Sequence, residues 1–179
     1  EITEGESKGS YLKAEKIMIA TGCKPRKVDE IEVDGKRVMT SREALAMTEQ
    51  PKSIAIMGAG AIGAEFAYFL NAFGTKVTLI EMLPSVLPVE DAEVSKAIEK
   101  SFAEQGIDCC VDTRVDAIEV GEDSVSLTLA HGEETETLEA ESLLLAIGVV
   151  PNLEGALSEK LKLELNRGYL KVDERYETS

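Results

Sequence analysis

The feature of this sequence that most restricts its fold is a loop with three glycines, held between two short apolar runs. Ser53–Met57 is strand-like, residues 58–63 read Gly-Ala-Gly-Ala-Ile-Gly, and residues 64–73 carry the small and apolar side chains of a buried helix. A second apolar run, Lys76–Ile80, ends at Glu81, which lies 23 residues after Gly58. Strand, Gly-x-Gly-x-x-Gly loop, helix, strand and acid, in this order, are the pattern of a βαβ unit that binds a dinucleotide.

Each glycine of the loop has its own physical reason. Gly58 allows a sharp turn out of the strand, Gly60 lacks the Cβ that would keep a pyrophosphate away from the backbone, and Gly63 lets the helix pack closely on the sheet. The helix then offers its N–H groups and its positive dipole end to the phosphates. The alternative is a tight turn that binds no ligand, but three glycines would then cost stability without a return in packing.

Glu81 indicates which dinucleotide the loop would hold. A carboxylate at this strand end can accept hydrogen bonds from both hydroxyls of the adenosine ribose, and it repels a 2′-phosphate. Residues 82–90 contain no Lys or Arg that could neutralise such a phosphate. The sequence therefore favours NAD over NADP, and the alternative for Glu81 is an exposed acid without a ligand.

The residues after Glu81 predict the rest of a parallel sheet and an antiparallel insertion. Residues 91–105 have the spacing of an amphipathic helix, and residues 107–111 and 143–147 are apolar runs typical of buried strands. Between them, residues 115–139 alternate apolar and polar side chains, as antiparallel strands do. The expected fold class is α/β: a three-layer, Rossmann-like parallel sheet with an antiparallel β-meander, at about residues 113–140, inserted in a crossover.

The two ends of the chain are less regular. The apolar residues 15–20 stop at Thr21-Gly22, which predicts a buried strand that ends in a tight turn. Residues 23–40 have the composition of a loop, residues 41–47 fit a short capped helix, and residues 169–172 fit a closing strand.

Composition excludes several classes of function. The formal net charge of −15 repels nucleic acid and anionic lipid, and no apolar stretch reaches the roughly 18 residues of a membrane-spanning helix. Three cysteines without paired spacing favour a reducing, cytoplasmic compartment. With a single histidine, His131, a metal site or a histidine-based catalytic triad has almost no ligands or bases available.

Several motifs together resemble the pyridine nucleotide–disulfide oxidoreductases, and within them the dihydrolipoamide dehydrogenase branch. They occur in the order of that family and cover nearly the whole chain. The matching segments are Ile-Ala-Thr-Gly at residues 19–22, Thr-Ser-Arg-Glu-Ala-Leu at 40–45, the glycine loop with Glu65, Gly-Thr-Lys-Val-Thr-Leu-Ile-Glu at 74–81, Ala-Ile-Gly-Val-Val-Pro-Asn at 146–152 and Gly-Tyr-Leu-Lys-Val-Asp at 168–173.

The resemblance implies a role for particular residues. It assigns the NAD phosphates and ribose to the loop and the first turn of its helix, the adenosine ribose to Glu81, the adenine side to Val115 and the nicotinamide side to Gly148. It also implies that Thr21 and Gly22 form one edge of an FAD site. The implied NAD contacts in the loop and helix are Gly58, Ala59, Gly60, Ala61, Ile62, Gly63, Ala64 and Glu65. Cys23, Cys109 and Cys110 are expected to be inert thiols, so no catalytic residue and no metal ligand is expected in this chain.

The resemblance also implies an organisation in three parts. Residues 1–50 would lead from a flavin domain upstream, residues 51–150 would form the NAD-binding domain, and residues 151–179 would return toward the flavin domain. The implied function is the transfer of hydride between NAD(H) and FAD in an enzyme that serves a lipoyl-bearing protein and forms a homodimer, with this chain alone being catalytically incomplete. Two alternatives stay open: the NAD(H) domain of an NADH oxidase or peroxidase flavoprotein, and an NAD-sensing domain without catalysis.

Overall fold

The computed structural model describes residues 1–179 except Glu1, Thr3, Asp29 and Glu30. The chain divides into two compact units. The first, here called the sheet unit, is Lys24–Val150, and the second, the terminal unit, combines Glu1–Cys23 with Pro151–Ser179.

A parallel sheet forms the centre of the sheet unit, with the strand order β2-β9-β3-β4-β5. At its middle, Ile56 lies between Leu144 of β9 and Leu79 of β4. The strands are β2 (Val38–Thr40), β3 (Ser53–Met57), β4 (Lys76–Ile80), β5 (Asp108–Cys110) and β9 (Ser142–Leu145). The parallel sheet predicted from the apolar runs is confirmed.

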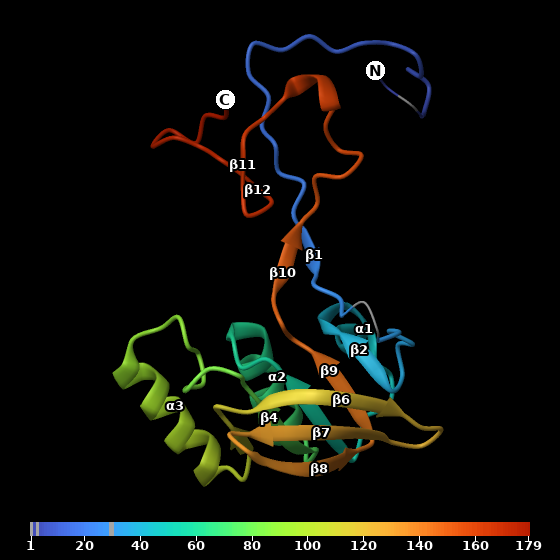
Figure 1. The fold of residues 1–179 in the computed structure, drawn as a ribbon. Coiled ribbons are helices and arrows are strands. Elements are labelled where there is room, and N and C mark those ends of the chain that lie inside the picture. Colours follow the sequence, from blue (N-terminus) through green and yellow to red (C-terminus); the bar gives the residue numbers. More distant parts are fainter. Residues whose placement is uncertain (1, 3, 29–30) are drawn as a thin grey trace. The chain divides into compact units, whose positions relative to one another are not determined.

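Helices cover one face of this sheet (Figure 1). Helix α2 (Ala61–Ala72) connects β3 to β4, and α3 (Ala92–Glu104) connects β4 to β5, while the short α1 (Ser41–Ala46) follows β2. Leu70 of α2 and Phe102 of α3 are buried in the same apolar cluster as Ile56 and Leu79 of the sheet. The predicted start of α2, at residue 64, is three residues too late.

The early start of α2 has a local cause. Gly60 has the extended backbone of a helix cap, with φ −69° and ψ −174°, so the helix begins directly after it. Gly63 is then buried inside the first turn and does not precede the helix. The sequence pattern predicts Gly63 in the loop, whereas it lies in the first turn of the helix.

The other face of the sheet is covered by the meander, which consists of β6 (Arg114–Val120), β7 (Val125–His131) and β8 (Glu134–Ala140). Alternate residues of β7, such as Leu127 and Leu129, are buried with Ile80 and Leu143 in a second apolar cluster. The meander lies on the crossover from β5 to β9, and together with the helices and the sheet it gives the predicted three-layer fold.

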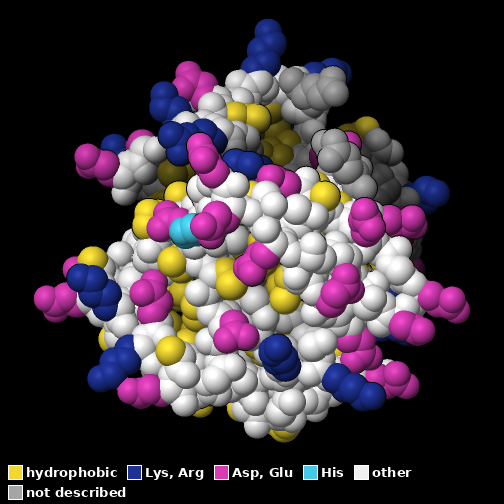
Figure 2. Space-filling model, turned by 60° about the horizontal axis from the view of Figure 1, so that its bottom comes forward, with side chains coloured by type: hydrophobic (Ala, Val, Ile, Leu, Met, Phe, Trp, Pro, Cys, Tyr) yellow, Lys and Arg dark blue, Asp and Glu magenta, His cyan; other side chains and the backbone are white. Residues whose placement is uncertain are grey.

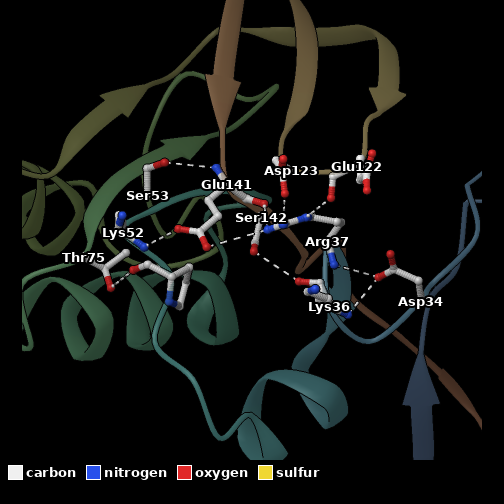
Figure 3. Close-up of polar contacts among 11 residues, drawn as sticks. Asp34, Lys36, Arg37, Lys52, Ser53, Thr75, Glu122, Asp123, Glu141 and Ser142 are labelled. Atoms are coloured by element: carbon white, nitrogen blue, oxygen red, sulfur yellow. Dashed lines mark hydrogen bonds and ion pairs between the residues drawn. The ribbon is translucent and has the colours of Figure 1, made fainter.

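Arg37 fastens the turn of the meander to the sheet (Figure 3). Its Nε donates to the carbonyl of Glu122 at 3.0 Å, and its Nη1 donates to the carbonyl of Glu141 at 3.1 Å. The guanidinium also lies 3.4 Å from the Asp123 carboxylate and 3.7 Å from that of Glu141. Because the side chain of Arg37 is only 11% exposed, these partners replace most of the water it has lost.

The carboxylate of Asp34 holds the backbone turn that leads to Arg37. Its Oδ1 accepts the backbone N–H groups of Lys36, Arg37 and Val38 at 2.8, 2.8 and 2.9 Å. Partial burial of the Asp34 carboxyl raises its pKa, but the backbone N–H donors outweigh burial and hold the pKa below its ordinary value. The ionised carboxylate is thus the form that fits this turn.

The terminal unit has no residue in the buried class among those that the structure describes. It contains a hairpin of β11 (Leu165–Asn166) and β12 (Tyr169–Leu170), the 3-10 helix η1 (Glu159–Leu161) and a bridge between Val172 and Thr178. A strand does form within the predicted range of residues 169–172. It does not close the parallel sheet as predicted, because β12 pairs with β11.

Two further predictions at the ends of the chain need correction. Residues 15–20 form no strand, and Ile17 and Met18 are 83% and 89% exposed, because no described strand pairs with this run. The composition of residues 23–40 predicts a loop, but they contain β2 and also β1 (Cys23–Pro25), which pairs with β10 (Val149–Pro151). Of this stretch, residues 29 and 30 lie outside the described part.

None of the described helices has the length and apolar character needed to cross a membrane.

Candidate nucleotide-binding site

The loop of residues 58–63 leaves the carboxyl end of β3 and turns directly into α2. The backbone N–H of Gly58 donates to the carbonyl of Ile80 at 2.8 Å, and the φ of Gly58 is +103°, a value that favours glycine. A Cβ at Gly58 would lie 2.5 Å from the carbonyl oxygen of Ala146, and one at Gly63 would lie 1.9 Å from that of Gly58. Close packing of the backbone therefore requires two of the three glycines.

Gly60 is different. Its φ of −69° is available to any residue, and a Cβ built on it would meet no atom within 4 Å. The folded chain itself gives no reason for a glycine at this position. Gly60 lines an open pocket, so the space that a side chain would fill belongs to whatever enters that pocket.

The carboxylate of Glu81 ties the glycine loop to the end of β4. Its Oε2 accepts the N–H of Ala59 at 2.8 Å, and its Oε1 accepts the N–H of Leu83 at 2.9 Å. The backbone of Glu81 is held as well, because its N–H donates to Cys110 and its carbonyl accepts from Thr113, both at 2.9 Å. Glu81 is thus fixed at the point where the loop, β4 and the start of the meander meet.

The pocket has a volume of about 500 Å³ and lies at the carboxyl ends of β3, β4 and β9. Ligands of open α/β sheets bind at this edge, and a volume of this size suits a small molecule. We call it the glycine-loop pocket. Its lining residues are Met57, Gly58, Gly60, Ala61, Ile62, Ile80, Glu81, Met82, Leu83, Pro88, Thr113, Arg114, Val115, Ala146, Ile147, Gly148 and Val149.

The pocket brings together seven of the residues predicted to contact NAD: Gly58, Gly60, Ala61, Ile62, Glu81, Val115 and Gly148. Ala59 is fully buried behind the loop, and Gly63 and Ala64 are buried in α2. Glu65 is exposed on α2 and lines a separate groove of about 270 Å³ with Leu45 and Phe69. Thr21 and Gly22 belong to the terminal unit, where the carbonyl of Gly22 accepts the N–H of Asn152 at 3.0 Å.

Sequence reasoning missed Arg114, which lines the pocket together with Glu81. Residues 82–90, which directly follow Glu81 in the sequence, contain no Lys or Arg, whereas Arg114 comes from the first position of β6. Its neighbour Val115 was itself expected at the pocket, and this was the one signal that could have led to Arg114. The guanidinium of Arg114 forms an ion pair with Asp116, and Nη2 lies 3.1 Å from Oδ2.

A comparison with known protein families decides the identity of the chain. Residues 1–179 match the family model described as pyridine nucleotide-disulphide oxidoreductase. The chain belongs to this family. A dihydrolipoyl dehydrogenase from Chlorobaculum tepidum is 40% identical to it in an alignment 179 residues long, which covers 99% of this chain and 38% of that protein.

Solved structures of pyridine nucleotide-disulphide oxidoreductases and related proteins agree with this assignment. The crystal structure of LpdA from Mycobacterium tuberculosis has a TM-score of 0.75 at 33% identity, over 86% of this chain and 33% of that one. An NAD-dependent persulfide reductase from A. fulgidus has a TM-score of 0.70 at 32% identity, over 88% of this chain and 30% of that one. The chain spans about 38% of the first curated relative it matches.

The three cysteines of the chain are free thiols. Cys109 packs against the helix side of the sheet and Cys110 against the meander side, as their adjacent positions on a strand predict. Burial raises the pKa of Cys109 to about 11, with Glu99 adding to it, and burial followed by the charge of Glu136 raises the pKa of Cys110. Both thiols are therefore protonated, and so weak nucleophiles, at neutral pH.

Among the described residues, no three His, Cys, Asp or Glu side chains are grouped so that they could hold a metal ion.

Proposed function

We propose that the sheet unit binds NAD(H) in the glycine-loop pocket, and that it does so as part of a flavin-dependent dihydrolipoyl dehydrogenase. The observation that carries the proposal is the open space at Gly60. The fold would accept a side chain there, but that side chain would fill part of the pocket. Membership of the pyridine nucleotide-disulphide oxidoreductase family supports this reading.

The start of α2 suits the pyrophosphate. Its cap is Gly60, which has no side chain to accept a hydrogen bond from the first turn. The first N–H groups of a helix have no partner within the helix, and the helix dipole favours an anion there. A phosphate near Gly60 could approach these donors closely because no Cβ stands in its way.

Glu81 suits the adenosine ribose. Each of its carboxylate oxygens accepts one backbone N–H, which leaves acceptor positions on both oxygens for hydroxyl donors. The negative charge disfavours a 2′-phosphate, so we propose NAD and not NADP as the natural ligand. Val115 would lie toward the adenine and Gly148 toward the nicotinamide.

The other predicted contacts have different positions around the pocket. Ala61, Ile62 and Gly63 would approach the pyrophosphate through their backbone, while Ala59 and Ala64, whose N–H groups donate to Glu81 and Gly60, would hold the loop in shape. Glu65, which lines a separate groove, would approach the nicotinamide side. Bound NAD and FAD would supply the hydride chemistry, and the residues of this chain would position the nicotinamide. Thr21 and Gly22 would contribute one edge of the flavin site.

The larger function rests on the relatives. The curated relative from Chlorobaculum tepidum is named a dihydrolipoyl dehydrogenase. We propose that the complete protein passes electrons between a lipoyl-bearing partner and NAD through FAD, works as a homodimer and resides in the cytoplasm. A second candidate, a reductase of another sulfur substrate, is supported by the likeness to the NAD-dependent persulfide reductase.

Calorimetric titration of the chain with NADH and with NADPH tests the proposal. We expect NADH to bind more tightly, by about tenfold or more, because a charge-assisted contact of Glu81 with the ribose is worth roughly 1.5–3 kcal/mol. Equal affinities would contradict the role of Glu81. The absence of any binding of either nucleotide would contradict the proposed site.

A further inference from the structure

Two opposite charges lie at the same pocket. Glu81 repels a 2′-phosphate, but Arg114, the only Lys or Arg among the described residues that line the pocket, would attract one. A guanidinium presents donors in a fork that matches the oxygens of a phosphate. Glu81 alone therefore does not account for a preference for NAD.

Asp116 is the partner of this guanidinium. Arg114 donates from Nε to Oδ1 and from Nη2 to Oδ2, the second at 3.1 Å, so the pair is bidentate. This arrangement occupies one of the two edges by which a guanidinium can hold the oxygens of a phosphate, and it neutralises the charge that would attract one.

The backbone of β6 favours this pairing. The register between β6 and β7 shifts between Val115 and Ala117, which leaves Asp116 as the extra residue of a β-bulge. A bulge changes the direction of a side chain and is common beside functional sites. Val115 thus keeps its contact with the apolar cluster while Asp116 pairs with Arg114 at the rim of the pocket.

We propose that Asp116 is a specificity-determining residue that keeps Arg114 from accepting the 2′-phosphate of NADP(H). The proposal rests on the proposed function of the pocket. Asp116 neutralises the cation at the adenosine end, and Glu81 then determines the preference for NAD. If Asp116 loses its charge, Arg114 becomes available to NADPH.

The size of the effect follows from exposure. The side chains of Arg114 and Asp116 are 63% and 37% exposed, so water screens the pair and its contribution is small. We expect Asp116→Asn to tighten NADPH binding about three- to tenfold at low salt and to leave NADH binding within about twofold. The gain should shrink as the salt concentration rises through the range in which surface charges are screened.

Three variants separate this effect from a general loss of negative charge. The double variant Asp116→Asn with Arg114→Ala should lose the gain, because the gain acts through the guanidinium. Glu104→Gln removes one carboxylate from the exposed Lys100–Glu104 pair of α3, which does not line the pocket, and it should change neither affinity. Asp116→Ala should reproduce the effect of Asp116→Asn.

The same titrations distinguish the two proposals. If the unmodified chain binds neither nucleotide, the proposed function is wrong. If it binds NADH normally but Asp116→Asn leaves the ratio of NADPH to NADH affinity unchanged, or weakens both affinities alike, the role of Asp116 is wrong. A gain that survives in the double variant also overturns it.

Discussion

At the scale of single residues, the three glycines of one loop serve different ends. Gly58 and Gly63 are required by the fold, since a Cβ on either would collide with a backbone carbonyl. Gly60 is not required by the fold, and its neighbourhood is open. The sequence motif does not distinguish the three glycines. The structure shows that Gly60 is the position at which a substitution can affect ligand binding without affecting folding.

Gly60→Val is therefore expected to abolish nucleotide binding while the chain stays folded. Its branched side chain would stand in the pocket beside the start of α2, and we expect the affinity for NADH to fall by about 100-fold or more. Valine is a poor helix cap, so a loss of stability of about 0.5–1 kcal/mol is expected. Calorimetry and circular dichroism measure the two effects.

Ala72→Val, at the last position of α2, is the matched control for the added bulk. Ala72 is exposed and does not line the pocket, so binding should be unchanged. Normal NADH binding by a folded Gly60→Val variant would mean that the phosphates bind elsewhere.

At the scale of elements, the sequence predicts some parts well and others poorly, and the reason is length. The meander was predictable because Val125, Leu127 and Leu129 alternate with polar residues over a long strand that has one buried face. The three residues of β2 are too few to show any period, although all of them are buried. The sequence does not indicate Arg114, because the pairing of β5 with β4, and not distance along the chain, brings the start of β6 to the end of β4.

The meander depends on Arg37 for its attachment, and Arg37→Met should reveal this. The variant keeps most of the side-chain volume but removes the donors of the carbonyls of Glu122 and Glu141, and it leaves the Glu141 carboxylate with only the N–H of Lys52. We expect the free energy of unfolding to fall by about 2–4 kcal/mol, measured by urea denaturation. Lys100→Met, at a side chain that is 79% exposed, should change it by less than about 0.5 kcal/mol. Equal effects of the two substitutions would show that the contacts of Arg37 are not stabilising.

The start of α1 should make stability depend on pH. Thr40 donates its hydroxyl to the carboxylate of Glu43, and this bond, ahead of the opposing effect of burial, holds the pKa of Glu43 below its ordinary value. A lowered pKa in the folded state stabilises the protein above the ordinary pKa of glutamate, and the contribution is lost as the pH falls through the folded pKa.

Glu43→Gln should therefore cost about 0.5–1.5 kcal/mol at pH 7, and the difference from the unmodified chain should close toward pH 3. Urea denaturation at several pH values measures this dependence. Glu104→Gln on α3, whose carboxylate is 67% exposed, serves as the control and should change the free energy of unfolding at pH 7 by less than about 0.5 kcal/mol. A difference that stays constant between pH 7 and pH 3 would exclude the capping carboxylate as its cause.

At the scale of the whole molecule, the two units of the chain differ in how fully they are buried. The sheet unit has apolar clusters on both faces of its sheet, while the terminal unit has no buried residue among those described. Acidic side chains outnumber basic ones over the face shown in Figure 2, in keeping with the net charge of −15. Because the overall charge repels an anionic nucleotide, the attraction must come from a local feature. The positive end of the α2 dipole, at the start of that helix, is such a feature.

Residues 1–179, purified alone, should form a colourless protein. We expect this protein to bind NADH without oxidising it, with or without lipoamide. Cys109 and Cys110 face opposite sides of the sheet with raised pKa values, so they cannot exchange with a disulfide substrate as a reactive pair. His131 is exposed at the end of β7 and does not line the glycine-loop pocket, so it is not placed to act as a base for a substrate there. Absorbance near the flavin bands and the rate of NADH consumption measure both parts of the expectation. A yellow protein, or steady turnover of NADH with lipoamide, would mean that these residues already contain a working redox centre.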